Sequence, residues 1–256
     1  MNTVFIQGAS RGIGFSLINE LIGRNIFVIA SCRNIKNEKL NSLPKSHLKL
    51  IELDLLNDKH IENFGMEFSQ AIQGKLMLSH VSMAGVLIPE KSMKQVSYAS
   101  INESFKVNCI SPFLIVKETI PFMLQTVKSP SSNLKPTCVY ISAKVGSISE
   151  NNQLGGWYSY RSSKAAGNML WKTLSCELGP KGISCFSVHP GNNIFLLRFG
   201  FVDTDMTRAY HKNIPQEKVQ SSSEAANRLA NLILNNNSRD LNGKFFDLQN
   251  KEYILW

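Results

Sequence analysis

Short apolar segments alternate with longer amphipathic segments from one end of the chain to the other. The apolar segments have the length and composition of buried strands, and they fall at residues 3–7, 26–31, 47–52, 76–83, 137–142, 183–189 and 244–248. The amphipathic segments have helical periodicity and fall at residues 13–23, 59–73, 99–126, 159–178 and 223–234. Strand–helix alternation builds right-handed βαβ units, whose parallel sheet is covered by helices on both faces. The sequence therefore predicts one doubly wound α/β domain of about seven strands over residues 1–256.

The composition supports a folded globular domain and excludes several other classes. Of the 256 residues, 43% are hydrophobic, which excludes global disorder and is enough for one sizeable core. No run of consecutive apolar residues approaches the roughly 18 that a membrane span requires, so we expect no membrane segment. The N-terminus lacks the pattern of a secretory signal peptide, and the five cysteines form no C-x-x-C pair. Both features indicate a cytoplasmic location, where thiols stay reduced.

The chain is basic, with 28 Lys and Arg against 19 Asp and Glu, a formal charge of +9. These basic residues are dispersed and form no cluster of five or six, so we expect no nucleic-acid partner. A solvated basic surface and a site for an anionic small molecule both account for the excess. The cysteines have no histidine at ligand spacing, so we expect no metal site.

The first predicted strand ends in a glycine-rich turn. Residues 8–14 read G-A-S-R-G-I-G and stand between the apolar strand and the first helix. At such a junction, glycines let a pyrophosphate approach backbone N–H groups at the amino end of the helix. A glycine pattern of this kind is weak evidence for a nucleotide site by itself, but it is strong evidence at the first strand–helix junction of an α/β chain. It predicts a Rossmann-type dinucleotide site with cofactor contacts from Gly8, Ser10, Arg11, Gly12, Ile13 and Gly14.

The end of the second predicted strand indicates which dinucleotide is bound. NAD sites usually offer an Asp or Glu there to the ribose hydroxyls, and residues 30–34, A-S-C-R-N, contain neither. A guanidinium matches phosphate geometry, so Arg33 and Arg11 can bind the 2′-phosphate of NADP. The alternative is that both are ordinary surface arginines; we expect NADP. Asp54, followed by Leu55 after the third strand, is placed either to meet the adenine edge or to cap the helix that follows.

Tyr160 and Lys164 form a Y-x-x-x-K pair on a predicted helix, so their side chains share one face. A tyrosine with an unperturbed pKa of about 10 is a poor acid or base at neutral pH. A neighbouring ammonium and a positively charged nicotinamide favour the phenolate and lower that pKa toward the working range. Tyr158 is not an equivalent candidate, because Ser162 stands four residues after it. The pair is therefore a candidate for general acid–base catalysis.

On these residues, the chain resembles the short-chain dehydrogenases/reductases over its whole length, with the motifs in the family's order. The segments 145–149, V-G-S-I-S, and 155–161, G-G-W-Y-S-Y-R, are similar to the branch that contains the C-factor and sniffer-like carbonyl reductases. The ending, G-K-F-F-D at 243–247 with Trp256, is also similar to that branch. The resemblance implies an oxidoreductase that uses NADPH to reduce a small-molecule carbonyl compound.

The resemblance implies roles for matching residues. Tyr160 would protonate the carbonyl oxygen as hydride leaves the reduced nicotinamide, and Lys164 would bind the nicotinamide ribose and lower the tyrosine pKa. Asn108 matches the helix asparagine that supports a proton-relay water; the alternative is a polar residue that bonds within its own helix. The resemblance also implies cofactor contacts from Ala84, Gly85, Pro190, Gly191, Val202 and Thr204.

Two motifs depart from the family pattern. Ser82 and Met83 replace the asparagines of the N-N-A-G motif, which removes amides that tie strands together. The family's catalytic serine stands three residues before the glycine of S-x-x-G, and here that position holds Ala143. Ser142 lies one residue earlier, where strand geometry turns its side chain to the opposite face unless the strand end twists. We expect Ser142 to serve in catalysis, with Ser147 as the alternative donor to the substrate oxygen.

A nine-residue segment interrupts the turn after the sixth predicted strand. The family's P-G runs directly into an aromatic–Val-Asp-Thr segment, whereas here residues 192–200 separate Gly191 from Phe201. The segment is mostly apolar, so exposing it would cost roughly 25 cal/mol per Å² of apolar surface. It is either an enlarged substrate lid or the in-frame translation of a short unspliced stretch. We expect the substrate loop or lid region to span about 191–222.

The leading hypothesis is an NADPH-dependent carbonyl reductase with Tyr160 as general acid/base and an aldehyde or ketone as substrate. The rival is an NADP-binding signalling or regulatory protein of the same fold with little or no turnover. The displaced serine and the segment 192–200 motivate this rival. The family resemblance also implies a homodimer packed through the helices that carry Asn108 and Tyr160.

Overall fold

The computed structural model describes residues 1–130, 135–151, 155–191, 220–234 and 240–256. Its strands form one sheet in the order β3-β2-β1-β4-β5-β6-β7-β8, in which β1 to β7 run parallel and β8 is antiparallel to β7. The strands are β1 (Asn2–Gln7), β2 (Phe27–Cys32), β3 (Leu48–Glu52), β4 (Leu76–Ser82), β5 (Thr137–Ile141), β6 (Ser184–His189), β7 (Phe245–Asp247) and β8 (Glu252–Ile254). The doubly wound α/β fold predicted from the sequence is confirmed.

The strand count differs from the prediction by one. All seven predicted strands occur, and β8 is an eighth that the sequence analysis missed. It contains three residues and pairs with β7 in a register that sets Tyr253 opposite Phe246. A three-residue edge strand is too short to show an alternating pattern, so no sequence signal marks it. Lys251, with φ of 58°, lies in the turn between the two strands.

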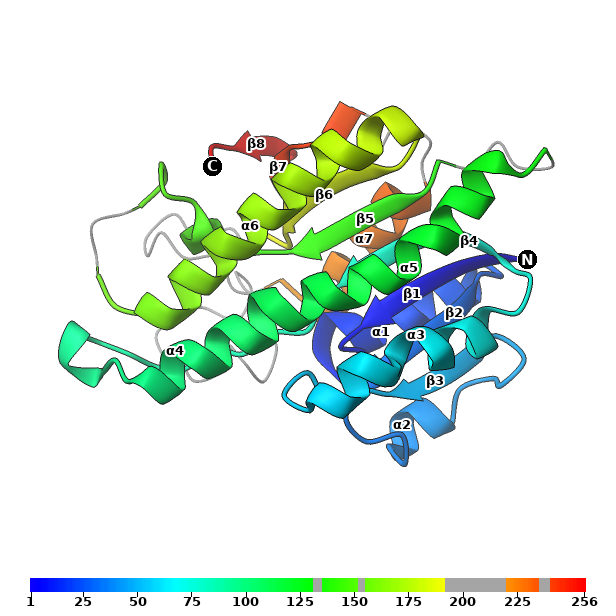
Figure 1. Cartoon of the computed structure of the whole chain (residues 1–256), viewed down its shortest axis with the longest axis horizontal. Helices are drawn as coiled ribbons and strands as arrows, with labels where there is room; N and C mark the ends of the chain where they lie inside the picture. Colours follow the sequence, from blue (N-terminus) through cyan, green and yellow to red (C-terminus); the bar gives the residue numbers. More distant parts are fainter. Residues whose placement is uncertain (131–134, 152–154, 192–219, 235–239) are drawn as a thin grey trace.

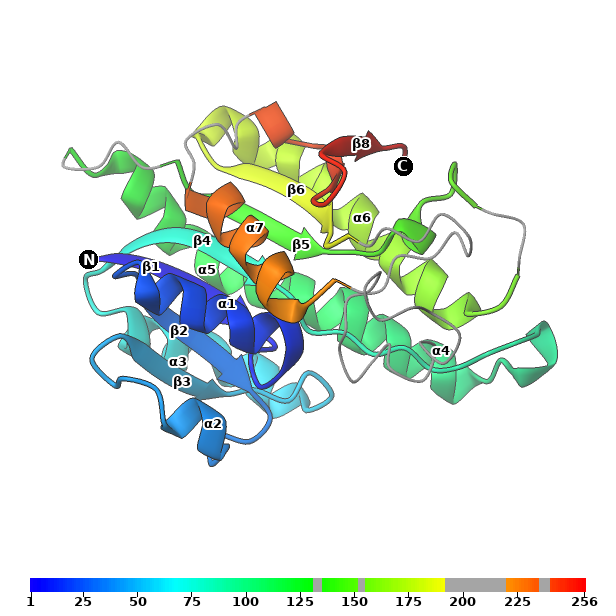
Figure 2. The same cartoon turned by 180° about the vertical axis from the view of Figure 1, so that it is seen from behind.

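Helices cover both faces of the sheet. α1 and α7 lie together on one face (Figure 2), and α3, α5 and α6 cover the other (Figure 1). The helices are α1 (Gly12–Gly23), α2 (Glu38–Asn41), α3 (Asp58–Ile72), α4 (Tyr98–Phe105), α5 (Ser111–Lys128), α6 (Tyr158–Leu178) and α7 (Ser222–Leu234). The five predicted helices are all present, and α2 is a single turn that the sequence analysis did not predict.

The helix predicted at 99–126 is one long helical run. A π-helical turn, Lys106–Ile110, joins α4 to α5 within it. By length and composition alone, the run Tyr98–Lys128 is the one described helix that could cross a membrane. Polar and charged residues interrupt its apolar residues, so it contains no long run of consecutive apolar residues that would predict a membrane span. In the structure it packs on the sheet, where Ile115 and Met123 are buried.

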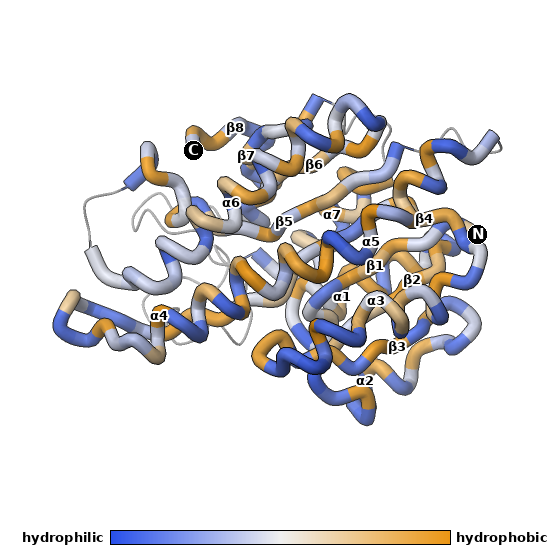
Figure 3. Tube along the Cα trace, viewed as in Figure 1, coloured by the Kyte–Doolittle hydropathy of each residue, from blue (hydrophilic) through white to orange (hydrophobic). Residues whose placement is uncertain are grey.

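The core consists of two apolar clusters, one on each face of the sheet. Alternate residues of β1 enter different clusters: Val4 and Ile6 lie in the one with α1 and α7, whereas Phe5 packs against Phe64 and Phe68 of α3. Figure 3 shows hydrophobic segments along the central strands and hydrophilic ones in the peripheral loops. Strands buried on both faces read as continuous apolar runs, which is the pattern that predicted the parallel sheet.

A buried polar network joins β4 to α5. His80 bonds to Thr119 Oγ1 through Nδ1 at 2.8 Å and to Ser82 Oγ through Nε2 at 2.9 Å. The Thr119 hydroxyl donates to the Val116 carbonyl, so it accepts from His80 Nδ1, which carries a proton. Burial lowers the pKa of His80 to about 3. Ser82, which stands where the family has an asparagine, is therefore held to α5 through a histidine.

We predict that His80 makes acid destabilisation steeper. The unfolded chain protonates this histidine near pH 6.5, whereas the folded protein excludes the proton until about pH 3, so the free energy of unfolding falls as the pH drops through this range. The contribution between pH 7 and pH 4 is about 3 kcal/mol. A His80→Gln variant should be less stable at pH 7 but lose stability less steeply toward pH 4 in urea unfolding. Equal slopes for the two proteins would contradict this assignment.

Candidate active site

A cavity of about 310 Å³ opens at the carboxyl ends of the parallel strands, beside the reversal of strand order between β1 and β4. Its walls come from the segments that follow β1 to β6 and from α6. The cavity brings together the following residues selected from the sequence: Gly8, Ser10, Arg11, Gly12, Ile13, Gly14, Arg33, Asp54, Leu55, Ala84, Gly85, Ser142, Tyr160, Lys164 and Pro190. The local patterns of the chain thus converge on one site.

The turn after β1 requires glycine at two positions. Gly8 has a φ of +89°, and a Cβ there would lie 2.7 Å from the Ala84 backbone. A Cβ on Gly14 would overlap the carbonyl oxygen of Gly8, so the start of α1 packs directly on the turn. The first N–H groups of a helix have no intrahelical partner, and the N-cap residue Arg11 provides no side-chain cap to them. The turn therefore fits the pyrophosphate of a dinucleotide.

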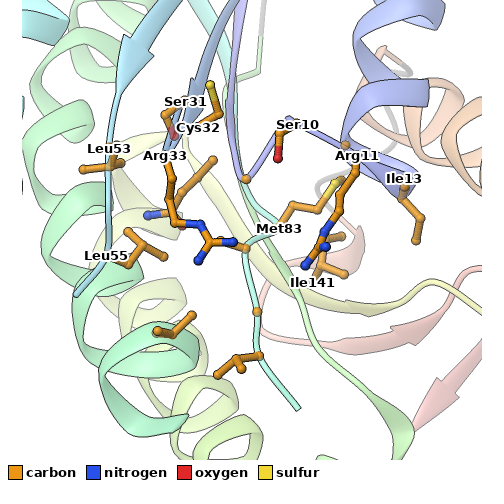
Figure 4. Close-up of a pocket in the computed structure, with 18 of the residues that line it drawn as sticks. Ser10, Arg11, Ile13, Ser31, Cys32, Arg33, Leu53, Leu55, Met83 and Ile141 are labelled. Carbon is orange, nitrogen blue, oxygen red and sulfur yellow. The ribbon is translucent and has the colours of Figure 1, made fainter. Parts of the chain in front are cut away.

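Two arginines reach the same cavity. Figure 4 shows the side chains of Arg11, at the start of α1, and Arg33, just after β2, directed into it from different sides. Both residues are exposed to solvent. The end of β2, Ser31 and Cys32, contains no carboxylate that would repel a phosphate. Both guanidinium groups are therefore placed where they can bind a phosphate group in the cavity.

Asp54 lies just beyond β3 and lines the cavity. Its carboxylate accepts a hydrogen bond from the Leu56 N–H at 3.0 Å, and its own N–H donates to His60 Nδ1 at 3.1 Å. The helix that follows, α3, is capped by Asn57, whose side chain accepts from the Lys59 N–H at 3.1 Å. The helix-cap alternative for Asp54 is therefore wrong, because Asn57 holds that position.

Tyr160 and Lys164 lie one turn apart near the start of α6, and they are 8% and 3% exposed. Lys164 Nζ donates to the Ile141 carbonyl at 2.8 Å and lies 5.9 Å from the centre of the Tyr160 ring. Burial lowers the pKa of Lys164 to about 7 and raises the pKa of Tyr160. In the protein alone, burial thus outweighs the expected effect of the ammonium on the phenol. Tyr160 keeps its proton at neutral pH, which is the form that a general acid needs.

Asn108 lies in the π-helical turn behind the cavity wall and is fully buried. Its side chain accepts from the Val86 N–H at 2.7 Å and donates to the Val86 carbonyl and to Ser163 Oγ, both at 2.9 Å. Val86 belongs to the loop after β4, and Ser163 belongs to α6. The alternative that Asn108 bonds within its own helix is therefore wrong, since its side chain joins two other parts of the fold.

The backbone carbonyl of Asn108 has a separate partner. In an α-helix it would accept from residue 112, but Pro112 has no N–H. The hydroxyl of Tyr140 donates to this carbonyl at 2.6 Å instead. The Tyr140 ring stacks on Trp171 and lies 4.9 Å from Lys164 Nζ. A carbonyl oxygen has two lone pairs, so a relay water at Asn108 would share this acceptor with Tyr140.

The two candidate serines have different surroundings. Ser142 lines the cavity and is 3% exposed, and its Oγ has no hydrogen-bond partner among the described residues. Ser147 Oγ donates to the Leu255 carbonyl at 2.5 Å and accepts from the Glu150 N–H at 3.0 Å. These bonds hold Ser147 beside β8, and it does not line the cavity. Of the two candidates, Ser142 is therefore the one in the cavity wall, with Ala143 next to it, and its Oγ is buried.

The remaining predicted residues lie beyond this cavity or beyond the described chain. Gly191 is buried with a φ of +100°, and a Cβ there would overlap Gln249, but it does not line the cavity. Val202, Thr204 and the segment 192–200 lie outside the described residues. The same is true of most of the lid region predicted at about 191–222, so its two interpretations stay as predictions.

Several residues in the wall were not selected from the sequence. They are Gln7, Ser31, Cys32, Leu53, Leu56, Met83, Val86, Glu103, Val107, Ile141, Ala143 and His189. Position at the carboxyl end of a predicted strand was an available signal for Gln7 and His189. Gln7 is 1% exposed, and neither polar atom of its carboxamide has a partner among the described residues. Burial lowers the pKa of His189 to about 4 despite the nearby Asp247 carboxylate, so this ring is neutral at the cavity.

Sequence comparison finds relatives over most of the chain. A family model described as short chain dehydrogenase matches residues 2–214. An uncharacterized oxidoreductase of Saccharomyces cerevisiae is 30% identical over 269 residues, covering 99% of this chain and 97% of that protein. C-signal of Myxococcus xanthus is 26% identical over 176 residues, covering 69% of this chain and 90% of that protein.

Structural comparison finds the same fold in carbonyl reductases. The carbonyl reductase Sniffer of D. melanogaster superposes with a TM-score of 0.83 and 24% identity over 100% of both chains. An NADPH-bound carbonyl reductase from chicken fatty liver superposes with a TM-score of 0.81 and 24% sequence identity, covering 99% of this chain and 98% of that one. These neighbours show the fold, and the similarity to C-signal agrees with the branch indicated by the sequence motifs. Because the family model matches residues 2–214, the chain belongs to the short chain dehydrogenases, a family of oxidoreductases that use NAD(P).

Proposed function

We propose that this protein is an NADPH-dependent carbonyl reductase that converts an aldehyde or ketone into an alcohol with Tyr160 as general acid. The observation that carries the proposal is the buried, protonated phenol of Tyr160 in the wall of the same cavity as the glycine turn after β1. The fold that the chain shares with two carbonyl reductases, one of them bound to NADPH, supports this reaction class and cofactor.

The proposed cofactor would be held by groups from the turn after β1, from the end of β2 and from α6. The turn that contains Gly8 would bind the pyrophosphate through backbone N–H groups. Arg11 and Arg33 would bind the 2′-phosphate, and Lys164 the nicotinamide ribose. When bound, NADPH would supply the hydride that the carbonyl carbon accepts.

Residues of the chain itself donate the proton and stabilise the negative charge that its transfer leaves behind. Tyr160 O–H donates to the carbonyl oxygen, so the oxygen gains a proton as the carbon gains hydride and the product is an alcohol. Negative charge then develops on the Tyr160 oxygen, and the ammonium form of Lys164 stabilises it. The bond from Lys164 to the Ile141 carbonyl keeps the amine at this place. Ser142 is a second donor: its Oγ has no partner among the described residues, so turning toward the substrate sacrifices no such bond.

Replacing Tyr160 tests the reaction and the general acid together. We expect wild-type protein to oxidise NADPH in the presence of at least one member of a panel of small aldehydes and ketones. Tyr160→Phe should lower kcat by about 10²- to 10⁴-fold, because the proton donor is lost while the ring still fills its place. NADPH binding, followed by fluorescence, should change little.

Tyr158→Phe is the matched control for this experiment. Tyr158 lies on the same turn of α6 but is 42% exposed and does not line the cavity, so its variant should keep wild-type kcat. A Tyr160→Phe enzyme as fast as wild type would refute the assigned role. Tight NADPH binding by a wild-type protein that turns over no carbonyl would instead favour the NADP-binding regulatory protein.

Replacing Arg33 tests the choice of cofactor. A charge-assisted bond to phosphate contributes about 1.5–3 kcal/mol, so Arg33→Ser should lower kcat/KM for NADPH by about 10- to 100-fold and leave that for NADH nearly unchanged. Lys36→Ala is the matched control, because Lys36 is exposed, carries the same positive charge as Arg33 and is absent from the cavity wall. An equal loss with both cofactors in Arg33→Ser would contradict the 2′-phosphate assignment.

We also propose a homodimer packed through the helical run α4–α5 and through α6. Ile110 and Leu114 on the first and Met169 on the second are exposed, at 48%, 41% and 65%. Contact between two copies would bury these side chains. Light scattering should then give about twice the chain mass of 28.6 kDa, and a mass of one chain would contradict the proposal.

A further inference from the structure

A buried carboxylate lies between the loop after β4 and the start of α6. Glu90 is 1% exposed, and its carboxylate accepts three hydrogen bonds. Two come from Ser159, whose N–H donates to Oε2 at 2.9 Å and whose Oγ donates to Oε1 at 2.6 Å. The third comes from Ser100 Oγ of α4, which donates to Oε1 at 2.8 Å. One side chain thus joins a loop and two helices.

Glu90 provides the cap that the sequence next to α6 lacks. The helix starts after Trp157, which has a left-handed φ of 52° and gives no side-chain cap. The Ser159 N–H is one of the first N–H groups of α6, which need a partner from outside the helix. Glu90 supplies that partner from 69 residues away, and a carboxylate also suits the positive end of the helix dipole.

The carboxylate and the backbone of Glu90 act on the same turn. The Glu90 carbonyl accepts from the Trp157 N–H at 2.7 Å. Gly156, with a φ of +74°, passes so close that a Cβ there would lie 2.9 Å from this carbonyl oxygen. Burial alone would raise the pKa of the Glu90 carboxyl, but the hydrogen bonds from Ser159 and Ser100 hold it below its usual range. The group is therefore ionised at neutral pH and accepts through both oxygens.

We propose that Glu90 is a positioning residue for catalysis: it fixes the first turn of α6 and thereby the direction of the Tyr160 hydroxyl. Tyr160 directly follows Ser159, so the turn that Glu90 holds is the turn that carries the proton donor. Lys164, one turn later, is anchored separately at the Ile141 carbonyl. Loss of Glu90 should then disturb Tyr160 more than the cofactor-binding Lys164. The inference rests on the proposed reductase function.

Glu90→Ala separates positioning from cofactor binding. We expect kcat for carbonyl reduction to fall by about 10- to 100-fold, the scale of a misplaced catalytic group, while the dissociation constant of NADPH stays within about twofold. Glu90→Gln keeps one acceptor oxygen and should recover part of the lost kcat. Glu177→Ala is the control: Glu177 lies near the opposite end of α6, away from the cavity, and its carboxylate accepts from Lys181 Nζ at 3.2 Å, so its loss should leave kcat unchanged.

A double-mutant cycle tests whether the loss of kcat arises from the contact between Glu90 and Ser159. Ser159→Ala removes the Oγ bond and should lower kcat less than Glu90→Ala, and adding it to Glu90→Ala should cause almost no further loss, because both changes break the same contact. If Glu90→Ala does not fold, Glu90→Gln and Ser159→Ala carry the test. Additive losses, or a folded Glu90→Ala enzyme with wild-type kcat, would overturn the proposal. So would losses of kcat and NADPH affinity in equal proportion.

Amide hydrogen exchange tests the same contact without turnover. In Glu90→Ala, a peptide covering residues 157–163 should exchange faster than in wild type, while peptides from β5 should not change. No change at 157–163 would overturn the proposal directly. If the wild-type protein reduces no carbonyl compound at all, the proposed function fails, and the exchange result alone decides whether Glu90 holds this turn.

Discussion

The site depends on the contact between the turn after β1 and the chain that leaves β4. A side chain on Gly8 would overlap the Ala84 backbone, so the two segments meet without any side chain between them. They belong to the neighbouring strands at which the strand order reverses, and that reversal is what opens a crevice at the carboxyl ends. The cofactor turn and the loop that carries Val86 and Glu90 both begin at this contact. Their geometry is therefore set by two small residues.

α6 is fixed to this junction by polar contacts at successive positions. Ser159, Ser163 and Lys164 bond to the loop after β4, to the π-helical turn and to the end of β5, and Tyr160 lies among them. Apolar packing sets the depth of a helix on a sheet but is not directional, so it does not fix rotation about the helix axis. Hydrogen bonds are directional, so they fix this rotation. This explains why a carboxylate, an amide and an amine are buried where the helix must present a phenol.

The parts of the structure that local pattern controls were predictable from the sequence. Seven strands, the glycine turn and the i,i+4 spacing of Tyr160 and Lys164 are properties of contiguous residues, and the structure has them where they were expected. The partners of Asn108 and Glu90 were not predictable, because they lie 10 to 69 residues away in the sequence and no periodicity links them. The direction of the Ser142 side chain was also beyond prediction, since it depends on how the end of a strand twists.

Burial acts on the two ionisable groups of the site, Tyr160 and Lys164. It raises the pKa of Tyr160 and lowers the pKa of Lys164 to about 7, so each group is driven toward its neutral form. A neutral phenol is ready to donate to a carbonyl oxygen. Alcohol oxidation at the same site would need the phenolate, which burial disfavours and only added positive charge or alkaline pH would restore. The positively charged oxidised nicotinamide would supply such charge, so burial sets the protonation state of Tyr160 in the protein alone and does not set the direction of the reaction.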